Sequence, residues 1–399
     1  MKIFREEFAV AQMETIRETV LDWRKDMEPH LLGLLEAKQA RQGKGSYKPR
    51  EAQDVAERLG RLLGAHGVSG HAHNVRRMGG GASKEQFLFD LVDSSGATTE
   101  KLVLRMDPLE GIVETSRARE AEVIAMIGAV VPVPSIAFVD ADGRHMGQPA
   151  MITRFVRGDT KPRDAVAGPS GVGIIIGEQA SAVLMPQYIN NLVAIHGFDF
   201  SGATLPTYAV PQAGTTQAAL WQLNFWERVL EDDRIDASPL LTYAACWLRE
   251  RAPVCATPVL LHGDYRLGNF MFDEDSLEMT AILDWELAHI GDFHEDIAYS
   301  LEPLFCSRNE AGQPLVASMM PVQAFLDVYA KHTGREIDPV VLHWYHVLNS
   351  FKLSVMNFAS GVRAARDGTN HQSAFLGYLA ACHVGLSGTL CRLLEGEGA

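Results

Sequence analysis

The sequence has few cysteines and no long apolar run. Its five cysteines are dispersed along 399 residues without a C-x-x-C pair, which is typical of reduced thiols and argues against a disulfide framework. Every apolar run falls far short of the roughly 18 residues that suggest a membrane span. The first residues are charged (Lys2, Arg5, Glu6) instead of forming a secretory signal. We therefore expect a cytoplasmic protein with no membrane partner.

An excess of basic residues is also missing. The chain carries 36 Lys and Arg against 50 Asp and Glu, a formal charge of −14, which argues against a nucleic-acid partner. This balance is compatible with a neutral or cationic small substrate, although many cytosolic proteins are simply acidic. With 47% hydrophobic and 22% charged residues, the composition is that of a globular chain with room for one large core or two linked cores.

The stretch from residue 259 to 272 organises the rest of the chain. A short apolar run leads to Asp264 and Asn269, and a second apolar run at 281–283 leads to Asp284. Strand–loop–strand geometry could bring these two carboxylates and one amide to one point. Oxygen ligands of this kind suit a hard cation such as Mg²⁺, which takes its other ligands from water and phosphate. An additional Asp can orient a hydroxyl, so the set indicates a kinase-type phosphotransferase.

A glycine-rich turn upstream is a candidate phosphate cradle. Predicted strands at 71–78 and 86–92 flank the run Gly-Gly-Gly-Ala-Ser at 79–83. Consecutive glycines let the backbone approach a ligand and direct several N–H groups at phosphate oxygens. Because ordinary hairpins carry the same pattern, this signal gains force only from the elements that follow it.

The next elements complete a small sheet. A third short strand from 101, stopped by Pro108, carries Arg105, and a helix at 115–127 carries Glu120. Glu120 could pair with Arg105 or lie on a solvated face. Two more strands are predicted at 135–140 and 148–155. This order predicts a small, mostly antiparallel sheet with one helix, complete by residue 155.

The pattern divides the chain into three parts. Residues 1–50 are predicted to form a helical extension and linker, which could be a docking helix, a dimerisation arm or a lid, so a homodimer is one option. Residues 51–155 form an N-terminal lobe. Residues 156–399 form a mainly helical C-terminal lobe with one short β segment around 259–284. The predicted fold class is α+β, with two lobes.

The motif His-Gly-Asp-x-x-x-x-Asn at 262–269, followed by Ile-Leu-Asp-Trp-Glu at 282–286, resembles the aminoglycoside phosphotransferase family. The resemblance covers about residues 55–390 and is strongest to the branch related to the kinase-like domains associated with acyl-CoA dehydrogenases. It implies a protein-kinase-like two-lobe fold, with a small antiparallel β lobe and a larger helical lobe. It also implies transfer of phosphate from ATP, with Mg²⁺, to a hydroxyl of a small molecule.

The resemblance implies a role for each candidate residue. Asp264 would be the catalytic base, Arg266 a cation beside the transferring phosphoryl group, and Asn269 and Asp284 the Mg²⁺ ligands. His262 and Asp296 would brace the catalytic loop. The residues that would bind ATP are Gly80, Gly81 and Ser83 of the loop, Arg105 with its helix partner Glu120, and Met151 and Thr153 of the hinge segment 151–155 beside adenine.

Three positions depart from the family pattern, and they motivate an alternative function. Arg105 stands where the wider kinase fold has Lys, Lys84 where Asn is common, and Phe293 where Pro is frequent. Arg is planar and permanently charged, so it grips phosphate differently from Lys. This exchange and the N-terminal arm favour a second hypothesis, a nucleotide-binding pseudokinase that serves as a scaffold. Metal-assisted hydrolysis is a third hypothesis, which no His/Asp ligand cluster supports.

The acceptor pocket is predicted less sharply than the nucleotide site. Aromatic residues at helical spacing are more often core than pocket, and an aminoglycoside pocket would require many exposed acids. The C-terminal helices are more apolar than that, so we do not expect antibiotic resistance. The candidate pocket residues are Trp344, Tyr345, Asn349, Lys352 and Asn357, with Glu286 and Asp292 near the metal.

Overall fold

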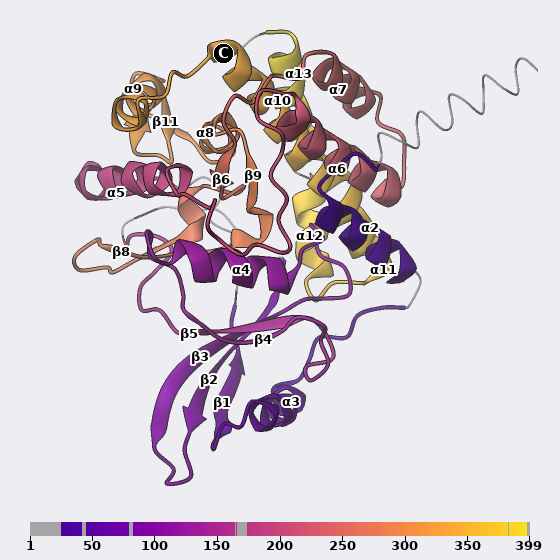
Figure 1. Ribbon diagram of the computed structural model, residues 1–399, viewed down its shortest axis with the longest axis vertical. Coiled ribbons are helices and arrows are strands. Elements are labelled where there is room, and N and C mark those ends of the chain that lie inside the picture. The colour runs from indigo at the N-terminus through magenta and orange to yellow at the C-terminus, as the bar shows by residue number, and fades with distance from the viewer. Residues whose placement is uncertain are drawn as a thin grey trace, which may run out of the picture.

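The N-terminal lobe is built on a five-stranded antiparallel sheet (Figure 1). The computed structural model describes residues 25–41, 45–79, 83–163, 165, 174–381 and 383–396. In sheet order the strands are β1 (His71–Arg77), β2 (Glu85–Val92), β3 (Thr98–Met106), β5 (Ala150–Arg154) and β4 (Ile136–Asp140). Helix α4 (Arg117–Ile127) follows β3 in the chain, and α3 (Ala52–Ala65) packs on β1. The small antiparallel lobe that the sequence predicted is therefore present.

Strand alternation gives this sheet one apolar face and one functional face. The apolar face packs against α3, and its fully buried members are Phe87, Phe89, Leu102 and Leu104. Arg105 lies opposite Met151 across the β3–β5 pair, and Thr153 lies two residues further along β5. Because successive side chains of a strand point to opposite faces, these three residues share the face that lies toward α4 and the large lobe.

The large lobe is mainly helical, as predicted. Its helices are α5 (Glu178–His196), α6 (Gln217–Asp233), α7 (Pro239–Glu250), α8 (His294–Ser300), α9 (Val322–Thr333), α10 (Pro339–Val355), α11 (Val362–Asp367), α12 (Ser373–Ala381) and α13 (His383–Leu394). A π-helical turn at Met356–Gly361 follows α10. Helices α9 and α11 end at Gly334 and Gly368, whose φ angles of 68° and 64° are left-handed.

The β structure of the large lobe is more extensive than the sequence predicted. Strand β6 (Val259–Leu261) pairs with β9 (His289–Gly291), and β7 (Phe270–Phe272) pairs with β8 (Met279–Ile282). A separate three-stranded sheet is formed by β10 (Ser307–Arg308), β11 (Pro314–Val316) and β12 (Met320–Pro321). The short strands β6 to β9 hold the two chain segments that contain the candidate site.

Helix α10 corrects the predicted acceptor pocket. Trp344 and Tyr345 are 2% and 1% exposed, and they belong to the main hydrophobic core of the large lobe. Asn349 donates to the Glu295 carbonyl, and the Lys352 ammonium is 2.8 Å from the Glu295 carboxylate. These side chains are buried structural residues, because the period of an apolar helix face is the same in a core and in a pocket.

The described part of the N-terminal extension packs on its own chain. Helix α2 (Pro29–Arg41) lies against α6, where Lys38 and Asp233 form a buried ion pair of 2.5 Å. Leu35 is fully buried in the core of the large lobe. Residues 1–24 of the predicted helical extension lie outside the described residues. For residues 25–41 the observed role is therefore docking within the chain.

One C-terminal stretch departs from the expectation that no segment could span a membrane. Residues Ser373–Leu394 are long and apolar enough to do so by length and composition, with a mean hydropathy of 1.4 and 18% burial. Within this stretch Leu386, Leu390 and Leu393 of α13 are buried in the same core as α10. These leucines give the apolar face of α13 a partner inside the large lobe.

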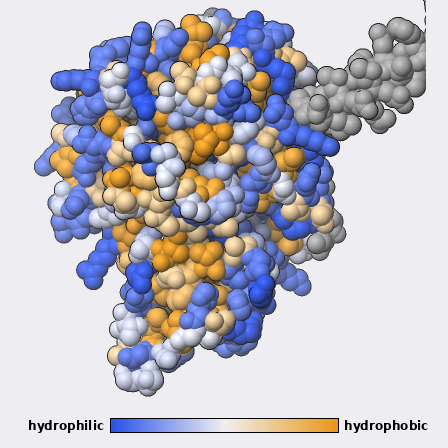
Figure 2. Space-filling model, in the orientation of Figure 1, coloured by the Kyte–Doolittle hydropathy of each residue, from blue (hydrophilic) through white to orange (hydrophobic). Residues whose placement is uncertain are grey.

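Hydrophobic residues also gather on the surface of the small lobe (Figure 2). Strand β4 lies at the edge of the sheet, and its residues Ile136–Val139 are half-buried. An edge strand such as β4 presents unpaired backbone N–H and C=O groups, and natural proteins usually cover or blunt such an edge.

The buried carboxyl of Glu302 should make stability depend on pH. Burial raises the pKa of Glu302 to about 8, and the Ser350 hydroxyl donates to both carboxyl oxygens at 3.0 and 3.2 Å. The folded chain therefore keeps a proton that the unfolded chain releases above its ordinary pKa of 4.5. By linkage, stability falls as pH rises from about 4.5 to about 8.

Glu302→Gln should remove this dependence. We expect the variant to be more stable than the parent at pH 8, by an amount of the order of a few kcal/mol, and to differ less at pH 5. Urea unfolding at both pH values measures the difference. The exposed carboxylate Glu310 offers a matched Gln control. A parent and a Glu302→Gln variant with parallel pH profiles would contradict the assignment of a buried, protonated carboxyl.

Candidate active site

The nucleotide side of the candidate site is the functional face of the small sheet. Arg105, Met151 and Thr153 lie on it together, as the strand register requires. Ser83 lies at the end of the glycine-rich turn between β1 and β2, whereas Gly80 and Gly81 lie outside the described residues. The predicted phosphate loop is therefore located by its two flanking strands and by Ser83.

Arg105 forms the predicted pair with Glu120 and reaches the large lobe as well. Its Nη1 donates to Glu120 Oε1 at 2.7 Å, and its Nη2 pairs with the Asp284 carboxylate. The second oxygen of Glu120 pairs with Arg117 of the same helix. Burial alone would lower the pKa of Arg105, but the charges of Glu120 and Asp284 raise it above its ordinary value. Arg105 thus links the sheet, α4 and the large lobe through one guanidinium.

The loop after β6 is braced by Asp296 of α8. The backbone N–H groups of His262 and Gly263 each donate to one Asp296 oxygen at 2.8 Å. Gly263 has φ of +80°, and a Cβ there would lie 2.4 Å from the Leu287 carbonyl oxygen. Only glycine fits such a position. The bracing roles predicted for His262 and Asp296 agree with these contacts.

The His262 ring joins the two halves of the motif. Its Nε2 donates to the Leu283 carbonyl at 2.9 Å, and its Nδ1 accepts the Asp264 N–H at 3.2 Å. The Leu283 N–H in turn donates to the Asn269 carbonyl at 2.7 Å. These bonds hold Asp264, Asn269 and Asp284 in one frame, as the spacing predicted.

Two neighbours hold Asp264. Arg266 Nε donates to its Oδ1 at 3.1 Å, and Asn269 Nδ2 donates to its Oδ2 at 2.7 Å. Burial and the charge of the nearby Asp264 raise the pKa of the Tyr299 hydroxyl, a proximity that the sequence analysis did not predict. The Arg266 guanidinium lies over the Phe305 ring at 5.3 Å. The carboxylate is thus fixed in orientation and half-buried, which suits a group that positions a hydroxyl.

Asp284 has an unusual backbone for a residue with a side chain. Its φ and ψ of 59° and 53° are left-handed, a conformation that costs energy outside glycine and is found at functional sites. Burial raises the pKa of Asp284, and the neighbouring Arg105 lowers it. The 3-10 turn Trp285–Leu287 follows directly. The chain therefore turns sharply to direct this carboxylate at Arg105.

The oxygen atoms around Asp284 suit a hard cation. The side-chain amide nitrogen of Asn269 donates to Asp264, so the side-chain oxygen of Asn269 is the atom that could bind a cation. The Asp284 side chain is 37% exposed. Within the described ranges, no group of three or more His, Cys, Asp or Glu side chains converges on a metal position. A cation held here would take its remaining ligands from phosphate and water, as Mg²⁺ commonly does.

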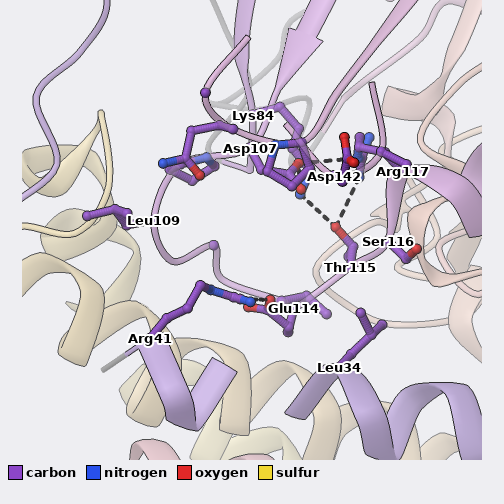
Figure 3. Close-up of a pocket in the computed structure, with 17 residues that line it drawn as sticks. Leu34, Arg41, Lys84, Asp107, Leu109, Glu114, Thr115, Ser116, Arg117 and Asp142 are labelled. Atoms are coloured by element: carbon purple, nitrogen blue, oxygen red, sulfur yellow. Dashed lines mark hydrogen bonds and ion pairs between the residues drawn. The ribbon is translucent and has the colours of Figure 1, made fainter. Parts of the chain in front are cut away.

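Lys84, where the family commonly has Asn, belongs to a buried charge network (Figure 3). Its ammonium is 2.7 Å from Thr115 Oγ1, 3.1 Å from the Asp107 carboxylate and 3.4 Å from Glu286. Arg117 contacts the same three partners. Sequence reasoning did not predict the partners of Lys84 and assigned no role to Arg117, because the network joins distant segments of the chain.

This network keeps a second acid of the site ionised. Burial alone would raise the pKa of Glu286, but Lys84, Arg117 and Arg105 lower it to about 2. On its other side, the network borders a cavity of about 340 Å³ between α2, the segment 107–117 and the β4–β5 connection. Figure 3 shows Arg41 and Glu114 paired across the cavity from Lys84.

Comparison with known proteins agrees with this geometry. The model of the phosphotransferase enzyme family matches residues 74–339. Acyl-CoA dehydrogenase family member 10 from Mus musculus is 27% identical over 259 residues, covering 62% of this chain and 22% of that protein. The probable acyl-CoA dehydrogenase IBR3 from Arabidopsis thaliana is 25% identical over 357 residues, covering 79% of this chain and 42% of that protein. The chain thus spans less than half the length of these relatives.

Solved structures share the fold. A putative aminoglycoside phosphotransferase from Ralstonia eutropha superposes with a TM-score of 0.61 and 20% identity, covering 86% of this chain and 99% of that one. A thermostable mutant of aminoglycoside phosphotransferase APH(4)-Ia, in a ternary complex with AMP-PNP and hygromycin B, gives a TM-score of 0.53 and 14% identity, with coverage of 84% and 97%. These similarities confirm the two-lobe kinase-like fold, and the matched model covers most of the chain. The chain belongs to the phosphotransferase enzyme family.

Proposed function

We propose that the protein is an ATP- and Mg²⁺-dependent kinase that phosphorylates a hydroxyl group of a small molecule. The observation that carries the proposal is the frame that holds Asp264, Asn269 and Asp284 together and joins them to Arg105. A phosphotransferase of this kind needs positioning and charge neutralisation more than covalent chemistry. The structural neighbour APH(4)-Ia, which was crystallised with AMP-PNP and hygromycin B, supports the choice of a nucleotide and a small acceptor.

In this proposal the small lobe binds the nucleotide. Adenine lies beside Met151 and Thr153, while Gly80, Gly81 and Ser83 cover the phosphates with their N–H groups. Arg105 offers its guanidinium to the phosphates while Glu120 keeps it in place. Mg²⁺ held by Asn269 and Asp284 would neutralise phosphate charge during transfer.

The large lobe positions the acceptor in this proposal. Asp264 would accept a hydrogen bond from the acceptor hydroxyl and take its proton as the acceptor oxygen bonds to the γ-phosphorus and the bond from that phosphorus to the oxygen of departing ADP breaks. Arg266, held on Asp264 and Phe305, adds positive charge beside the transferring group.

A pseudokinase that binds nucleotide without transferring phosphate is the second candidate. The ion pair between Arg105 and Asp284 favours it, because a carboxylate already paired with a cation is less available to a metal. The retention of Asp264 beside Asn269 favours the enzyme, since a binding module has no need of a base.

One experiment separates the two candidates. The full chain is incubated with ATP, with and without Mg²⁺, against a panel of small hydroxyl compounds, and ADP formation is measured. We expect ADP that depends on both Mg²⁺ and one acceptor class, together with a thermal shift by Mg-ATP. A thermal shift without ADP for any acceptor would favour the pseudokinase. If Mg-ATP caused no thermal shift and no acceptor led to ADP formation, both candidates would be contradicted.

A further inference from the structure

We infer that Glu28, in the N-terminal extension, is a positioning residue for the nucleotide site, and this inference rests on the proposed function. Glu28 lies just before α2 and is 3% exposed. Its two carboxylate oxygens accept from Arg119 of α4 at 2.6 and 2.7 Å. The Ala209 N–H donates to the same carboxylate at 2.8 Å. A residue far from the motif in sequence thus contacts the helix that carries Glu120.

Arg119 uses every donor of its guanidinium. Besides the two bonds to Glu28, Nε and Nη2 donate to the Ala288 carbonyl at 3.3 and 3.2 Å, and Nη1 donates to the Thr207 carbonyl. The guanidinium also lies 3.7 Å from the centre of the Tyr208 ring. A guanidinium has five N–H donors, so this side chain is fixed in one orientation.

Arg119 joins the two chain segments that carry the acids bound to Arg105. Along α4, Arg119 precedes Glu120. Along the large-lobe segment, Ala288 follows Asp284 by four residues, across the 3-10 turn Trp285–Leu287. Glu120 and Asp284 both pair with Arg105. Arg119 therefore connects the same two segments, α4 and the stretch after Asp284, that Arg105 also connects.

Glu28 is what keeps Arg119 in this position. A buried guanidinium requires a compensating charge, and Glu28 supplies it with bidentate geometry. The position of Glu28 is itself fixed by its neighbour Asp26, whose carbonyl accepts from Asn224 at 2.6 Å and whose carboxylate accepts from Trp221 at 3.3 Å. The extension therefore sets the distance between α4 and the Asp284 segment from outside the site.

The test measures Mg-ATP affinity of the full chain by calorimetry for the parent and for Glu28→Gln. We expect the variant to bind Mg-ATP about 5- to 20-fold more weakly, because α4 and the Asp284 segment lose their common anchor. Glu28→Asp, which keeps the charge but is one methylene shorter, should lie between the two. Hydrogen exchange should also become faster in α4 and in residues 285–288 of Glu28→Gln.

Lys38→Met is the matched control. Lys38 forms another buried ion pair of the extension, but its partner Asp233 lies on α6 and not on α4. This variant should lose stability and exchange faster in α2 while keeping the parent affinity for Mg-ATP. The inference would be overturned if Glu28→Gln bound Mg-ATP as tightly as the parent, or if Glu28→Gln and Lys38→Met weakened Mg-ATP binding equally. Either result would leave the proposed function standing. A parent that binds no Mg-ATP would overturn the proposed function and, with it, the inference.

Discussion

Asp264→Asn should abolish phosphoryl transfer while leaving nucleotide binding nearly intact. The asparagine keeps the shape of the side chain, but its one carbonyl oxygen can accept from only one of Arg266 and Asn269, which bond to different oxygens of Asp264. It cannot take a proton from a hydroxyl. We expect the rate of transfer to fall by about 10³-fold or more. The dissociation constant for Mg-ATP should stay within a few-fold of the parent, because the proposed function places Asp264 toward the acceptor and not toward the nucleotide.

The measurement is single-turnover transfer to whichever hydroxyl compound supports ADP formation, together with calorimetry of Mg-ATP. Asp273→Asn is a suitable control, since Asp273 lies in the turn between β7 and β8 and accepts from Ser276 within that turn. A variant at Asp264 that transfers phosphate as fast as the parent would show that another group receives the proton. A variant that also fails to bind nucleotide would show that Asp264 serves the metal and not the acceptor.

Much of the site was predictable because its residues follow their elements closely. Arg105 lies near the end of β3, and Glu120 lies on α4, the next element in the chain, so the alternation of the strand and the length of the connection bring them together. Asp264 follows β6, Asn269 directly precedes β7, and Asp284 follows β8, which pairs with β7. In each case the local pattern determines where the side chain lies.

The contacts that the sequence did not predict are between segments far apart in the chain. Lys84 meets Glu286 across 202 residues of sequence, and Glu28 meets Arg119 across 91. Nothing in the local pattern distinguishes these charged residues from solvated ones. The same limit explains α10, where the spacing of apolar residues correctly predicted a helix but could not distinguish a core face from a pocket face. Trp344 is buried in the structure and therefore belongs to the core.

Replacing Arg105 should have the second-largest effect on the reaction. Arg105→Met removes the cation that joins Glu120 to Asp284, although Arg117 still pairs with Glu120. We expect Mg-ATP to bind more weakly and transfer to fall by about 100-fold, because the phosphates lose one positive partner and Asp284 loses its lobe-to-lobe contact. Calorimetry and single-turnover transfer measure the two effects separately.

Arg105→Lys tests whether the planar fork matters or only the charge. A guanidinium reaches Glu120 through one nitrogen and Asp284 through another, whereas an ammonium is a compact point charge on a flexible stem. We therefore expect the lysine variant to bind Mg-ATP better than the methionine variant but to transfer more slowly than the parent. If lysine matched the parent in both measurements, the two-sided contact would be dispensable, and only positive charge would be needed at this position. If the lysine variant bound Mg-ATP and transferred phosphate as weakly as the methionine variant, the two-sided contact of the planar guanidinium would be what the site requires.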